Sequence, residues 1–163
     1  MNAEVRGTSW ALSAQPQNVR AGRDRVLAQI RRWGHYVSED TADTVRLLVS
    51  EILTNAVEHG GGDTVQISMA VRPGELYVRI EDASSTAPVR RSAAEDAEDG
   101  RGLFLLSTLA NAWGAEPSKG GKAVWMTRSL PPRRPLLIDE RHRTALDERI
   151  RAARPRPRLP ISA

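Results

Sequence analysis

The stretch between residues 38 and 62 constrains the fold more than any other part of the chain. Seven apolar residues recur in it at intervals of three and four, the spacing of one buried helix face: Ala42, Val45, Leu48, Val49, Ile52, Leu53 and Ala56. Ser38 suits the N-cap position, and the acidic residues after it suit the positive end of a helix dipole. Three consecutive glycines from Gly60 onward end the pattern. The sequence therefore predicts one long amphipathic helix.

The segments around this helix predict the rest of a single domain. Helical spacing and period-two alternation give two further helices and five strands, with these approximate bounds: strand 5–12, helix 18–33, strand 65–71, strand 76–82, helix 103–112, strand 113–116 and strand 123–130. This order predicts an α+β fold. We expect a two-layer sandwich in which helices cover one face of a mixed, mostly antiparallel sheet.

The basic residues are concentrated at one end of the chain. Residues 1–130 carry 15 Lys and Arg side chains against 16 Asp and Glu, whereas residues 131–163 carry nine against four. Because Pro131-Pro132 separates the two parts, we expect a folded domain at 1–130 and a basic, Arg/Pro-rich tail at 131–163. A basic tail on a neutral body argues for nucleic acid less strongly than an evenly basic protein would, so we expect protein partners rather than nucleic acid. The tail contributes to partner binding or self-association, or it is a solvated appendage.

Composition excludes several other classes. No run approaches the roughly 20 apolar residues that a membrane-spanning helix needs, and the N-terminus does not read as a signal peptide. The absence of Cys excludes disulfides and thiolate chemistry, and it agrees with the cytoplasmic location that we expect. The three histidines are too scattered for a histidine-based zinc site.

Three polar residues occupy positions on a predicted helix or strand where apolar residues are more usual. Glu51 and Asn55 are four residues apart, so they share one side of the long helix at the border of its apolar face. They are either a solvated surface pair or a pair that faces a ligand. Asp82 continues the phase of the apolar residues of its strand, so its carboxylate should point toward the helices and needs a hydrogen-bond donor. An adenine amino group would serve; the alternative is an Asp that caps a turn.

A glycine-containing segment leads into the third helix. Residues 83–102 show no periodicity, and a loop of that length is more often functional or disordered than merely connecting. The segment ends in Gly100, Arg101 and Gly102, with Leu103 opening the helix. Glycines there let backbone N–H groups approach a phosphate, a helix N-terminus favours anions, and an arginine can add a bidentate contact. A single Gly-x-Gly before a helix is also common in ordinary turns.

The order and spacing of these features resemble the Bergerat ATP-binding fold of the GHKL (gyrase and histidine kinase) ATPase superfamily. The resemblance covers about residues 18–130, and the sequence of residues 48–60 is similar to that of the anti-sigma-factor serine kinases. Those proteins bind a sigma factor and phosphorylate an antagonist protein on serine. The resemblance implies ATP and Mg²⁺ as cofactors. It also implies site residues with these roles: Glu51 as catalytic base, Asn55 as magnesium ligand, Asp82 as the residue that reads adenine, and Gly100, Arg101, Gly102 and Leu103 at the phosphates.

The sequence departs from the family pattern after Asp82. Relatives usually have Asp-x-Gly-x-Gly there, whereas this chain has Ala83-Ser84-Ser85-Thr86, and Ala123 stands where a hydroxyl residue often assists adenine. We therefore carry two hypotheses within this superfamily, beside a third from a different class, a regulator that binds nucleic acid through the Arg/Pro tail. The first is a serine/threonine kinase that uses Mg-ATP and also sequesters a transcription factor, with a sigma factor or its antagonist as partner. The alternative is a non-catalytic, ATP-dependent binding module. A homodimer is left open.

Overall fold

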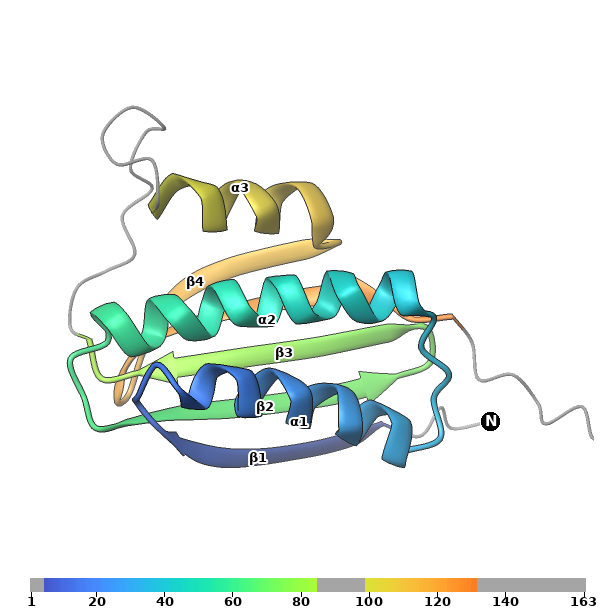
Figure 1. Cartoon of the computed structure of the whole chain (residues 1–163), viewed down its shortest axis with the longest axis horizontal. Coiled ribbons are helices and arrows are strands. Elements are labelled where there is room, and N and C mark those ends of the chain that lie inside the picture. The colour runs from blue at the N-terminus through green and yellow to red at the C-terminus, as the bar shows by residue number, and fades with distance from the viewer. Residues whose placement is uncertain (1–4, 85–98, 132–163) are drawn as a thin grey trace, which may run out of the picture. The chain divides into compact units, whose positions relative to one another are not determined.

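The computed structural model describes residues 5–84 and 99–131. The elements follow one another along the chain with these bounds: β1 (Arg6–Ser13), α1 (Asn18–Arg32), α2 (Glu39–His59), β2 (Thr64–Arg72), β3 (Glu75–Asp82), α3 (Asp99–Leu109), β4 (Ala112–Ser118) and β5 (Gly121–Ser129). The helices lie on one face of the sheet (Figure 1). The predicted α+β, two-layer architecture is therefore confirmed. The predicted basic tail lies outside the described residues.

The five strands form one sheet in the order β1-β2-β3-β5-β4. Between the strands that the structure describes, all four pairings are antiparallel, so the sheet is not mixed. Hairpins join β2 to β3 and β4 to β5, and a short hairpin connection can only produce antiparallel neighbours. The strand β5 pairs with β3 as well as β4, which brings the end of β3 next to the β4–β5 turn.

The long helix α2 is built as its sequence predicts. The hydroxyl of Ser38 accepts a hydrogen bond from the backbone N–H of Thr41 at 3.2 Å, and Gly60 is the C-cap. All seven apolar residues of the predicted face are buried, each 5% exposed or less. They pack on the inner face of the central strands, where Ile67 and Ile80 are both nearly inaccessible. The interior is thus one layer of mostly aliphatic side chains between the helices and the sheet.

The third helix differs from its predicted bounds at both ends. It was expected at 103–112, but it begins four residues earlier, at Asp99, and ends at Leu109. An acidic residue favours a helix start, and two glycines in the first turn were not enough to delay it. At the other end, the backbone N–H of Asn111 donates to Thr127 and its side chain accepts from Ser129. Pairing with β5 therefore ends the helix.

Among the residues that the structure describes, no helix is both long enough and apolar enough to cross a membrane.

Candidate functional site

Glu51 and Asn55 on α2 meet Gly102 on α3. Both α2 side chains are half-buried, and Gly102 is buried. A Cβ placed on Gly102 would lie 3.2 Å from Oε2 of Glu51 and 3.4 Å from Nδ2 of Asn55. The fold therefore brings together two segments about 50 residues apart in the sequence. It also packs the backbone of α3 at Gly102 so close to both side chains that a residue with a Cβ would crowd Glu51.

Asp82 lies at the end of β3 and is 5% exposed. Its Oδ1 accepts a hydrogen bond from the backbone N–H of Ser84 at 2.8 Å, and Nζ of Lys122 lies 3.8 Å from its Oδ2. Both sequence interpretations thus hold in part, because the carboxylate is buried below the helices and also caps a turn. Burial raises the pKa of Asp82 above its ordinary value, while the Ser84 N–H and the Lys122 ammonium act in the opposite direction.

Two glycines lie so close to Asp82 that neither position has room for a Cβ. A Cβ on Gly60, at the end of α2, would lie 2.7 Å from the Cβ of Asp82. A Cβ on Gly121, at the start of β5, would collide with the carbonyl oxygen of Asp82, and Gly121 has a positive φ of 153°. The sequence predicted Gly60 only as the end of the long helix, and it gave Gly121 no role. The structure shows that their lack of side chains lets α2 and β5 approach Asp82.

The two groups of polar residues lie at the same end of the domain. The C-terminal end of α2, the end of β3, the start of α3 and the β4–β5 turn gather at the left of Figure 1. Gly60, which touches Asp82, follows Asn55 by five residues, a rise of about 7.5 Å along the helix axis. A ligand that contacts both groups must therefore be elongated, with one end at Asp82 and the other beside Gly102.

The remaining predicted residues lie in the first turns of α3. Gly100 and Arg101 belong to the helix itself rather than to a loop before it, and the Arg101 side chain is exposed. Leu103 is half-buried and packs against the core. The structure thus brings Glu51, Asn55 and Gly102 together, keeps Asp82 apart from them beside Gly60, and leaves the Arg101 side chain exposed.

Lys122 is the residue that the sequence interpretation missed. The predicted strand at 123–130 leaves Lys122 out, yet it is the second residue of β5 and lies directly opposite Asp82 in the β3–β5 register. Its side chain is only 16% exposed. The available signal was the alternation of β5, in which Lys122 has the same phase as Val124 and the buried Met126.

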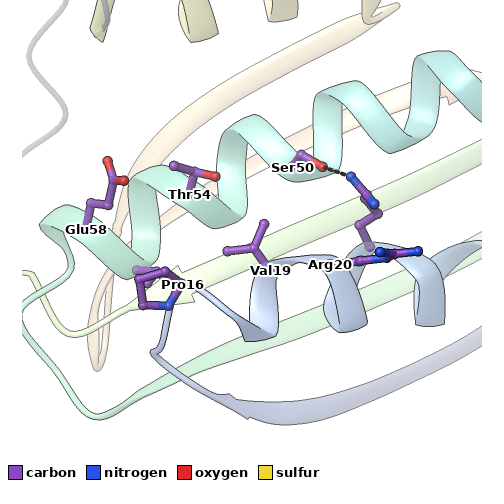
Figure 2. Close-up of a pocket in the computed structure, with 8 residues that line it drawn as sticks. Pro16, Val19, Arg20, Ser50, Thr54 and Glu58 are labelled. Carbon is purple, nitrogen blue, oxygen red and sulfur yellow. Dashed lines mark hydrogen bonds between the residues drawn. The ribbon is translucent and has the colours of Figure 1, made fainter.

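A separate groove lies on the opposite side of α2, against α1. It encloses about 460 Å³ and is lined by Pro16, Val19, Arg20, Arg23, Ser50, Thr54, Val57 and Glu58 (Figure 2). An Nη1 atom of Arg23 donates to the hydroxyl of Ser50 at 3.4 Å across it. None of the predicted site residues lines this groove, so it is distinct from the α2–α3 site.

The residue types of the α2–α3 site fit a nucleotide with its cation. Carboxamide and carboxylate oxygens are hard ligands of the kind that Mg²⁺ prefers, and Mg²⁺ is usually shared between one or two protein groups and phosphates. Gly102 lies in the first turn of α3, and the backbone N–H groups of a helix's first turn can bind a phosphate. The buried carboxylate of Asp82 suits a hydrogen bond from the exocyclic amino group of a nucleotide base.

An antiparallel sheet covered on one face by helices, with these polar residues at one end, defines a GHKL-type ATPase domain. The chain belongs to the histidine kinase-like ATPase domain family, whose model matches residues 12–128. It is also similar to a blue-light-activated histidine kinase 2 of Erythrobacter litoralis (strain HTCC2594), with 31% identity over 133 residues. That match covers 74% of this chain and 37% of the relative, so the chain spans little more than a third of the relative's length.

Proposed function

We propose that the domain binds Mg-ATP between α2, the end of β3 and the start of α3. The observation that carries the proposal is the close approach of Gly102, in the first turn of α3, to Glu51 and Asn55, which sets a helix N-terminus beside a carboxylate and a carboxamide. Asn55 would hold the cation, Gly100 and Gly102 would line the phosphates, and Arg101 would reach them from the rim. Asp82 would accept a hydrogen bond from the adenine amino group.

We further propose that the domain transfers phosphate to a serine or threonine of a protein partner. Phosphoryl transfer depends mostly on positioning and charge stabilisation, with one group orienting or deprotonating the attacking oxygen. Glu51 lies one turn before Asn55 on the same side of α2, so it is placed to accept the proton of a hydroxyl near the cation. The bound nucleotide supplies the phosphoryl group. The similarity to the anti-sigma-factor kinases supports a sigma factor or its antagonist as partner, in the cytoplasm.

A specific observation favours the second candidate, a binding module without phosphotransfer. The Ser84 N–H already occupies Oδ1 of Asp82, and Ser84 and Thr86 stand where relatives usually have the two glycines after this aspartate. A stiffer segment restricts how the backbone adapts to adenine. In such a module the nucleotide would set the conformation that a partner recognises.

Separating binding from transfer tests the proposal. Glu51→Ala should bind Mg-ATP nearly as the parent does while losing most transfer of labelled phosphate to a co-purified partner protein. Asn55→Ala should lose magnesium-dependent binding and transfer together. Thr54→Ala is the matched control, because Thr54 lies between them on α2 but lines the groove toward α1. GTP should bind poorly, since guanine presents a carbonyl where adenine has its amino group. Transfer at the parent rate by Glu51→Ala would remove its catalytic role, and no nucleotide binding by the parent protein would remove the proposed function.

A further inference from the structure

The pair formed by Asp82 and Lys122 is buried more deeply than a surface ion pair. The two side chains are 5% and 16% exposed, and Nζ of Lys122 lies 3.8 Å from Oδ2 of Asp82. That distance is too long for a hydrogen bond, so the attraction is electrostatic and is weakly screened at such burial. Lys122 therefore stands beside the carboxylate without occupying it as a direct donor.

The other neighbours of Asp82 show why the charge of Lys122 matters for the ionised form of this carboxylate. Glu81, adjacent on β3, acts against ionisation of Asp82, and Gly60, the C-cap of α2 that lies close to Asp82, has no side chain to carry a charge. The Ser84 N–H fixes Oδ1. Among the described residues for which an effect on Asp82 is resolved, Lys122 is the one cationic side chain that favours the ionised form.

We infer that Lys122 is a positioning residue that keeps Oδ2 of Asp82 ionised and oriented to accept the 6-amino group of adenine. The inference rests on the proposed nucleotide binding and adds a specificity determinant that lies on β5 rather than in the segment after Asp82. The competing interpretation is a purely structural pair that joins the ends of β3 and β5. A third is a general attraction of Lys122 for the phosphates.

Base discrimination separates these interpretations. We would measure by titration calorimetry the affinity for ADP and for the diphosphate of purine riboside, which lacks the 6-amino group. In Lys122→Met, the affinity for ADP should fall on the order of tenfold, the size of coupling between contacting groups, while the affinity for the purine analogue changes little. Lys122→Arg should restore the preference for ADP. Lys119→Met, an exposed lysine of the β4–β5 turn, is the control and should bind as the parent does.

A double-mutant cycle completes the test. If Lys122 acts through Asp82, then in an Asp82→Asn background the change Lys122→Met should alter ADP affinity less than about twofold. Lys122→Gln, which keeps a polar side chain, repeats the measurement should Lys122→Met melt early. An equal loss for ADP and the purine analogue would overturn the inference in favour of phosphate attraction. An unchanged preference for ADP would overturn it in favour of a structural pair. Failure of the parent to bind ADP would overturn the proposed function, and the inference with it.

Discussion

Replacing Gly102 by alanine tests the close approach of α3 to α2. The added Cβ would lie 3.2 Å from Oε2 of Glu51 and 3.4 Å from Nδ2 of Asn55. The first distance is a few tenths of an ångström too short for comfortable contact, and the atom involved is the end of a flexible side chain. We therefore expect the Glu51 carboxylate to swing aside rather than the helix to move.

The stability of Gly102→Ala should change little because two effects oppose each other. Alanine in a helix is favoured over glycine by about 0.5–1 kcal/mol. Mild crowding costs about 1 kcal/mol, the low end of the range for overpacked positions. The free energy of unfolding should therefore stay within about 1 kcal/mol of the parent value. The affinity for Mg-ATP should fall, because the added methyl group lies where the phosphates are proposed to bind. Weakening one charge-assisted hydrogen bond costs about 1.5 kcal/mol, or roughly tenfold in affinity.

The assay compares Mg-ATP affinity by calorimetry with thermal unfolding of the same samples. Thr108→Ala is the control, because Thr108 is exposed on α3 and its hydroxyl donates a hydrogen bond back to the carbonyl oxygen of Phe104. The control should keep the parent affinity. If Gly102→Ala binds Mg-ATP within twofold of the parent, then the space beside Glu51 and Asn55 is not the phosphate site.

Two further predictions concern stability. Ser38→Ala removes the acceptor of the Thr41 N–H and should lower the free energy of unfolding, measured by chemical denaturation, by about 1 kcal/mol. Thr44→Ala, further along α2, is the control and should lower it less. Equal losses in the two variants would show that Ser38 does not cap the helix. Hydrogen bonding to Arg79 lowers the pKa of Glu81, so the ionised form of Glu81 stabilises the fold above the usual glutamate pKa of about 4.3 and loses that contribution as the pH falls through the lowered value. Glu81→Gln should accordingly lower the melting temperature at pH 7 but not in acid below the lowered pKa, and a difference independent of pH would contradict the assignment.

The sequence by itself determined the elements whose residues interact locally or repeat regularly. The seven buried residues of α2 were predicted individually, because a helix places every third or fourth side chain on one face whatever it packs against. The inward phase of Asp82 followed in the same way from strand alternation. Glu51 and Asn55 could be predicted to share a side of the helix, but not to face a partner.

The tertiary structure decided which distant segments meet. The bounds of α3 depend on the pairing of Asn111 with β5, and the neighbour of Glu51 depends on where α3 lies. The position of Lys122 opposite Asp82 depends on the register between β3 and β5, and those two residues are 40 apart in the sequence. Periodicity gives the phase of a side chain within its own element but carries no information on register between elements. Packing against α2 and pairing with β5 supply that information, and they place a lysine from an apparent turn beside the buried carboxylate.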